Sequence, residues 1–115
     1  SLAAARACDF IGYDRDEEII RGFRDAGYPV TRDFFGVRCD NQTVYWELVR
    51  AGCGLGFGSV PAGAADPALE RIPLEVEIPK LEVWLTAHEA LRHTPRVDAV
   101  WQILADGIGE VLRSS

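Results

Sequence analysis

The sequence predicts an α/β protein in which a mostly parallel sheet is flanked by helices. Short apolar segments alternate with segments of helical spacing over residues 9–60. Helical spacing over residues 44–51 ends at Gly52 and Gly54, and the apolar run 55–60 follows at once. Short buried strands that alternate with helices imply a parallel sheet with right-handed crossovers.

The first strand and helix are expected within residues 9–27. Residues 9–13 are predicted to form a short buried strand, and Asp16 is a candidate N-cap for the helix that follows. Gly27 ends that helix, and Pro29 prevents its return. The apolar face of this helix is formed by Ile19, Ile20 and Phe23.

A second strand is predicted at residues 34–39 and a second helix at 44–51. A third strand is predicted at 55–60, closed by Pro61. The candidates for capping the second helix are Asp40, Asn41 and Thr43.

The remaining chain begins with a connection over 61–73 that can hold one helical turn. Residues 74–78 alternate apolar and acidic side chains, and 81–87 are predicted to form a better strand. Thr94, followed by proline, marks the start of a long helix. One face of this helix carries Val97, Val100, Trp101, Leu104, Ile108, Val111 and Leu112.

Composition limits the possible partners. The 115 residues have a net charge of −6, which argues against this chain gripping DNA or an anionic membrane by itself. The absence of Met and the opening on Ser1 suggest a piece of a longer protein. Three cysteines, Cys8, Cys39 and Cys53, form no C-x-x-C pair, so buried free thiols and a reducing, cytoplasmic setting are expected.

No set of residues predicts catalysis, a cofactor or a metal ion. The glycines at 52–58 lead from helix to strand, whereas a dinucleotide-binding loop leads from strand to helix. The spacing of His88 and His93 is one residue longer than in H-E-x-x-H, so surface histidines are expected. Ser59 does not lie in a G-x-S-x-G turn.

Four stretches of the chain resemble LysR-type transcriptional regulators. Residues 48–56, followed by Pro61, resemble the family's V-x-A-G-x-G-(I/L)-(A/G)-x-x-P signature. Residues 83–88 are similar to its (V/L)-W-L-(V/T)-x-H strand, and 94–100 are similar to its S-P-R-V-R-A entry to the last helix. Residues 10–15, which precede a predicted helix, are similar to a further stretch of the family in order and spacing.

The resemblance implies the two-lobed, type II periplasmic-binding-protein fold of the family's effector-binding domain. Residues 1–115 would be part of that domain, with about 9–80 forming the second lobe. About 81–115 would supply the crossover strand and the C-terminal helix of the first lobe. The rest of the first lobe and the DNA-binding winged helix-turn-helix would lie upstream. The apolar stripe with Trp101 and Leu104 would then lack a partner, which predicts self-association, and a single sharp monomer in light scattering would contradict this.

The resemblance also places a small-molecule effector at the carboxyl ends of the strands. The turns there contain residues 13–16, 41–43 and 58–60, and the effector-binding candidates are Tyr13, Asp14, Arg15, Gln42, Thr43 and Ser59. Free N–H groups at helix starts and the guanidinium of Arg15 favour an anionic effector. Capping and solvation are the competing interpretation, because the acidic residues near Arg15 would compete with an anion.

The function expected from the resemblance is effector sensing by a cytoplasmic, oligomeric regulator that is not an enzyme. DNA would be contacted only through the upstream winged helix. The alternative is a solute-binding or catalytic protein on the same two-lobed fold. An upstream signal peptide would favour solute binding, and an upstream winged helix would favour regulation.

Overall fold

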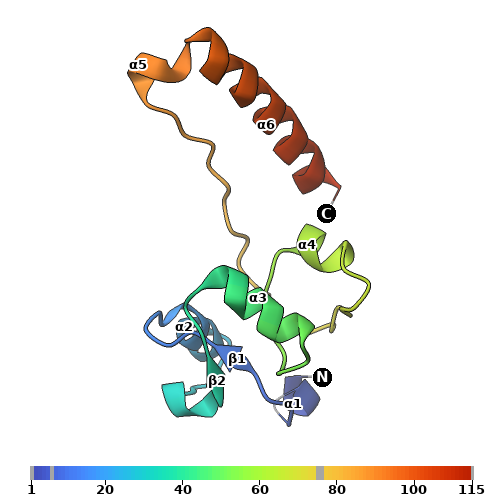
Figure 1. The fold of residues 1–115 in the computed structure, drawn as a ribbon. Helices are drawn as coiled ribbons and strands as arrows, with labels where there is room; N and C mark the ends of the chain where they lie inside the picture. The colour runs from blue at the N-terminus through green and yellow to red at the C-terminus, as the bar shows by residue number, and fades with distance from the viewer. Residues whose placement is uncertain (1, 6, 75–76, 115) are drawn as a thin grey trace. The chain divides into compact units, whose positions relative to one another are not determined.

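The computed structural model describes residues 2–5, 7–74 and 77–114, which form two compact units, Ser1–Pro79 and Lys80–Ser115 (Figure 1). The first unit contains α1 (Leu2–Ala5), β1 (Ile11–Gly12), α2 (Glu18–Asp25), the 3-10 helix η1 (Arg32–Phe34), β2 (Val37–Arg38), α3 (Gln42–Arg50) and α4 (Val60–Ala64). The second unit contains α5 (Glu89–Arg92) and α6 (Pro95–Arg113).

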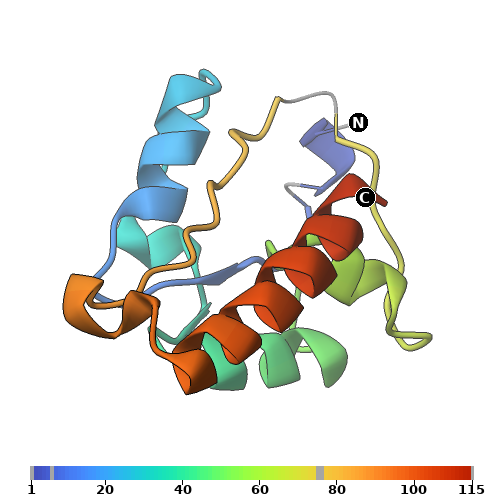
Figure 2. The ribbon, with the colours of Figure 1, turned by 90° about the horizontal axis from the view of Figure 1, so that it is seen from above.

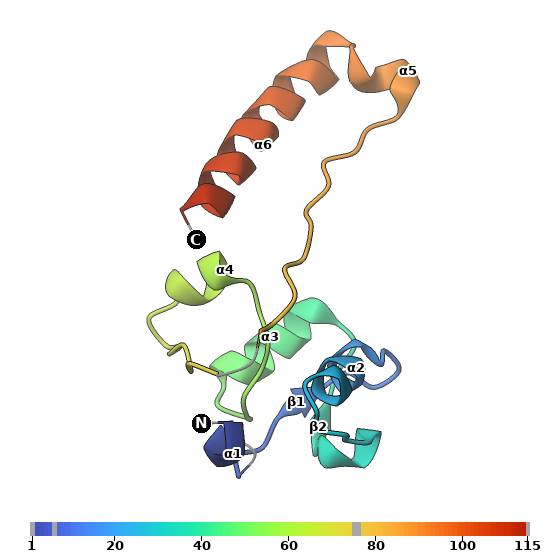
Figure 3. The same ribbon diagram turned by 180° about the vertical axis from the view of Figure 1, so that it is seen from behind.

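A two-stranded parallel sheet lies at the centre of the first unit. β1 pairs with β2 so that Ile11 lies opposite Val37. On the other side of β1, Phe10 forms a single parallel bridge with Leu55, whose carbonyl accepts the N–H of Ile11 at 2.8 Å. α2 and α3 lie on opposite sides of the sheet (Figures 1 and 3). The predicted α/β class with parallel pairing is therefore present in a small form.

The first predicted helix is confirmed, and the first predicted strand is present but shorter than expected. β1 falls within residues 9–13, and α2 buries Ile19 and Phe23. The predicted N-cap is wrong, because Glu17 is the N-cap of α2. Asp16, one residue earlier, accepts the N–H of Glu18 at 2.8 Å, so its side chain still satisfies one of the free amides at the start of the helix. The chain leaves α2 through Gly27, whose φ of +84° is the left-handed conformation that glycine adopts without steric cost.

Five phenylalanines fill the space beside the sheet. Their ring centroids are separated by 5.1–6.1 Å, and most neighbouring pairs meet edge to face. They are Phe10, Phe23, Phe34, Phe35 and Phe57.

The second strand is shorter than predicted. Residues 34–39 were expected to be extended, but Phe34 belongs to η1 and only Val37–Arg38 pair with β1. The N–H of Phe34 donates to Thr31 and that of Phe35 to Arg32, which turns the chain where a strand was expected. This turn brings the rings of Phe34 and Phe35 onto Phe23, so tertiary packing overrides the strand preference of the aromatic residues.

The second helix begins two residues earlier than predicted, and one of its three capping candidates is its N-cap. The side chain of Asn41 accepts the N–H of Val44 at 3.1 Å. α3 ends at Arg50, and Gly52 follows with a φ of +78°. The predicted helix end on glycine is confirmed.

The third predicted strand, 55–60, is wrong beyond its first residue. Of residues 55–60, Leu55 alone forms a bridge, to Phe10 beside β1, because the hydroxyl of Tyr45 on α3 accepts the N–H of Phe57 at 3.0 Å. The same hydroxyl donates to the carbonyl of Ile11 at 3.1 Å. Ser59 then caps α4, which supplies the helical turn predicted after Pro61 but starts it one residue earlier.

Glycines allow the 54–58 segment to lie directly against α3. A Cβ atom on Gly56 would lie 2.4 Å from a methyl group of Val49, and one on Gly58 would lie 2.2 Å from the ring of Trp46. Real Cβ atoms do not approach other atoms this closely. The backbone of this segment can therefore approach α3 closely only because Gly56 and Gly58 have no side chain.

The predicted strand at 81–87 is absent from the second unit. These residues have no regular secondary structure, and Leu81 and Trp84 are 80% and 77% exposed. A strand requires a neighbour for its backbone N–H and C=O groups, and no pairing of 81–87 occurs in the described part of the chain. The predicted alternation over 74–78 falls partly on residues 75–76, outside the described residues.

The long C-terminal helix is confirmed as α6, one continuous helix preceded by the short α5 (Figure 2). The predicted hydroxyl cap is wrong, because Thr94 donates its hydroxyl to the carbonyl of Leu91. Arg92 of α5 forms an ion pair with Asp98 at 2.8 Å and lies 4.0 Å from the ring centre of Trp101. These contacts join α5 to α6.

The prediction of buried cysteines is also wrong. Cys8 and Cys53 are exposed, Cys39 is half-buried, and all three are free thiols. Cys8 and Cys53 lie in the turns that follow α1 and α3.

Substitution of Gly54 by alanine is expected to destabilise the first unit by about 1–3 kcal/mol. Gly54 has a φ of +156°, and an added Cβ would lie 2.7 Å from the carbonyl oxygen of Asp9. That oxygen accepts the N–H of Leu55, so the substitution strains the bridge to β1. Urea unfolding followed by circular dichroism measures the change.

The matched control is Gly36→Ala, since Gly36 has an ordinary φ and open space around its Cα. This variant should remain within about 1 kcal/mol of the wild type. Equal losses in the two variants would contradict the assigned role of Gly54.

Candidate functional site

The parallel pairing brings together the two turns that follow β1 and β2. The Cys39 N–H donates to the carbonyl of Gly12 at 3.0 Å, which aligns the ends of the two strands. Beyond them, the hydroxyl of Tyr13 donates to the side-chain oxygen of Gln42 at 3.4 Å. Two of the predicted effector-binding residues, from turns 29 positions apart, are thus in contact.

Asp40 forms the strongest connection between these turns. Its carboxylate accepts the N–H of Asp14 at 2.8 Å and the N–H of Arg15 at 3.1 Å through each of its oxygens. The N–H of Arg15 is the main reason that the pKa of Asp40 is lowered, and the N–H groups of Asp14 and Asp16 and the charge of Arg15 act in the same direction. Partial loss of hydration opposes these effects.

From the sequence, Asp40 is predicted only as a candidate helix cap. The signal that could have found its role is the position of an acidic residue directly after one parallel strand, because the turn after the neighbouring strand presents its amides at the same edge. Asn41, the next residue, is the actual cap of α3.

Asp14 is held by two arginines. Its carboxylate forms ion pairs with Arg32 of η1 and with Arg38 of β2, the latter at 3.4 Å. Arg38 also donates to the carbonyl of Phe35 at 2.9 Å, which fixes its guanidinium beside the sheet. Arg15 is likewise exposed.

Internal oxygens accept several of the backbone amides at this edge. Asp40 accepts the amides of the turn after β1, and Asn41 accepts one amide at the start of α3. Gln42 and Thr43 are exposed at that helix start. The positive end of α3 remains, but internal oxygens already accept the amides of Asp14, Arg15 and Val44.

Ser59 has a local structural role in the described residues. Its hydroxyl oxygen accepts the N–H of Ala62 at 3.4 Å and caps α4. This contact lies within its own helix start, so the described contacts join Tyr13 to Gln42 but do not join Ser59 to either of them.

The histidines are surface residues, as predicted. His88 accepts the N–H of Ala90 at 3.2 Å and caps α5, and His93 is exposed. Among the described residues, no cluster of three or more His, Cys, Asp or Glu side chains is arranged to bind a metal ion. Within the same residues, no helix combines the length and apolar character needed to cross a membrane.

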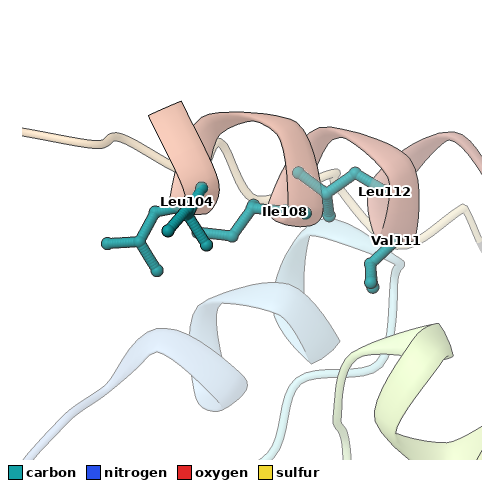
Figure 4. A pocket seen from close by; sticks show the side chains of 6 residues that line it. Leu104, Ile108, Val111 and Leu112 are labelled. Carbon is teal, nitrogen blue, oxygen red and sulfur yellow. The ribbon is translucent and has the colours of Figure 1, made fainter. Parts of the chain in front are cut away.

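A shallow apolar hollow lies on α6. Figure 4 shows Leu104, Ile108, Val111 and Leu112 projecting from the helix, and Ile103 also lines the hollow. No residue of α6 is buried in the described part of the chain. A helix with this apolar stripe and no buried residue retains a surface suited to packing against another element.

Comparison of the chain with protein-family models, with curated proteins and with solved structures finds no match.

Tyr45 lies directly beneath the candidate site. Its ring is 1% exposed and lies 5.3 Å from the ring of Tyr13, measured between centroids. Burial raises the pKa of Tyr45 to about 12, with a further contribution from Tyr13, while the N–H of Phe57 acts in the opposite direction. The hydroxyl therefore stays protonated and keeps its two hydrogen bonds over the neutral range.

Substitution of Tyr45 by phenylalanine is expected to cost about 1–3 kcal/mol at neutral pH, because the Ile11 carbonyl and the Phe57 N–H lose their partner. In the wild type, a native pKa above the unfolded value of about 10 means that ionisation favours unfolding. The free energy of unfolding that the wild type has below pH 10 should therefore decrease as the pH rises to about 12. The Tyr45→Phe variant should not show this decrease. Urea unfolding across this pH range measures both effects.

Tyr13→Phe is the control, since it also removes a tyrosine hydroxyl but from an exposed hydrogen bond. Its effect at neutral pH should be smaller than that of Tyr45→Phe. An alkaline loss of stability that persists unchanged in Tyr45→Phe would show that another group causes it.

Proposed function

We propose that the chain is the effector-sensing part of a LysR-type transcriptional regulator. The observation that carries this proposal is the presence of four family-like stretches in the family's order over residues 10–100. Each motif alone is weak, whereas their combination in register is specific. The structure supplies further support at the strand ends and in the second unit.

The first support is the parallel edge where Tyr13 contacts Gln42. Open α/β sheets bind ligands outside the carboxyl ends of their strands. Side chains from both turns are exposed or half-exposed there, as a ligand site requires. This unit would form one wall of the proposed effector site.

The second support is the division of the chain at Pro79 and Lys80. It falls beside the boundary expected between the second lobe and the crossover strand. Residues 81–87 are mostly apolar and mostly exposed, and they pair with no strand in the described part of the chain. This is expected for a crossover strand whose neighbours belong to the rest of the first lobe. The exposed face of α6 fits a helix that packs on that lobe or on a second copy of the chain.

In the proposed mechanism, a small molecule bridges the two lobes and favours one degree of closure over another. A ligand shifts such an equilibrium only by its difference in affinity for the two states. The change would alter the spacing of DNA-binding domains in an oligomer, with DNA contacted through the winged helix and a cytoplasmic location. The role is binding rather than catalysis.

The test is the intact mass of the native protein isolated from its own cells, together with the sequence of its N-terminal segment. We expect a considerably longer chain that opens on a basic helix-turn-helix. An upstream signal peptide would instead support a periplasmic solute-binding protein. A native chain beginning near Ser1 would contradict the regulatory proposal.

A further inference from the structure

We infer that Asp40 is a specificity-determining residue that excludes anionic ligand groups from the turn after β1. The inference takes this edge as the effector site, and in that respect it rests on the proposed function. The sequence alone favours an anionic effector at this turn, whereas the contacts of Asp40 favour a ligand group without negative charge there.

The first step is the geometry of the turn. Successive backbone N–H groups that converge on one point form a concave anion-binding site. Here the N–H groups of Asp14 and Arg15 converge on the carboxylate of Asp40, at 2.8 and 3.1 Å. The carboxylate therefore lies where a ligand carboxylate, phosphate or sulfate would otherwise bind.

The second step concerns the neighbouring charges. The carboxylate of Asp14 is held by Arg32 and Arg38, so these guanidinium groups are already paired. Asp16 lies two residues further along the same turn and accepts the N–H of Glu18. Apart from the paired Asp14, an anion arriving at the turn would meet the carboxylates of Asp40 and Asp16, with Arg15 as the exposed cation among the residues of this turn.

The turn after β1 presents hydrogen-bond acceptors to a ligand in place of free amides. The Asp40 carboxylate is exposed and retains lone pairs that its two amide partners do not use. Gln42 and Tyr13 add further polar groups beside it. A ligand that presents hydroxyl or amino donors to this turn is thus favoured over one that presents a carboxylate or phosphate.

Inorganic sulfate is a suitable probe for this inference, because it tests the turn without knowledge of the effector. In the full chain, backbone amide resonances of Asp14 and Arg15 are followed by NMR during titration with sodium sulfate, at ionic strength matched with sodium chloride. We expect a saturable shift of these resonances in Asp40→Ala and none in the wild type. The affinity for sulfate should be at least about tenfold higher in the variant than in the wild type. Asp25→Ala, which removes one exposed carboxylate at the end of α2, controls for net charge.

A wild-type chain that binds sulfate at these two amides would overturn the inference, as would an Asp40→Ala variant that folds and shows no shift. A pH titration of the wild type keeps the test decisive if the variant does not fold. The two amide resonances should then follow a carboxyl group whose pKa lies below the ordinary value of aspartate, and their failure to do so would also overturn it. Neither outcome depends on whether the native protein carries a winged helix.

Discussion

The hydroxyl of Tyr45 is the contact on which the architecture of the first unit depends. It donates to the carbonyl of Ile11 and accepts the N–H of Phe57. One buried atom thus joins α3, β1 and residues 54–58, the glycine segment. A tyrosine hydroxyl can do this because it is both a donor and an acceptor. Among the described residues, the sheet contains two paired strands and one bridge. The side-chain contact of Tyr45 replaces the backbone ladder of a third strand.

The remaining features of the unit follow from that arrangement. The backbone of residues 54–58 can approach α3 only because glycines leave room for Val49 and Trp46. Beside the sheet, five phenylalanines supply the apolar contact that a small sheet cannot provide alone. With this support, the ends of β1 and β2 hold the turns of the candidate site at a fixed register, and Asp40 joins one turn to the other.

Sequence reasoning located the elements that depend on local signals. β1, α2, the glycine end of α3 and the proline start of α6 were predicted because hydrophobic spacing, glycine and proline act within a few residues. The strands at 34–39, 55–60 and 81–87 were overestimated because strand pairing depends on distant partners. The contact of Tyr13 with Gln42 was within reach once the strands were taken as parallel, but the carboxylate of Asp40 on the amides of Asp14 and Arg15 depends on exact register.

The measurement that tests this account most directly is native-state amide hydrogen exchange at Ile11, Leu55 and Phe57. If the Tyr45 hydroxyl joins the glycine segment to β1, these three amides belong to one cooperative unit and should open with the same free energy. Rapid exchange at Phe57, with Ile11 and Leu55 still protected, would show that the segment beyond Leu55 is not held by Tyr45. That result would contradict the central role given to this contact.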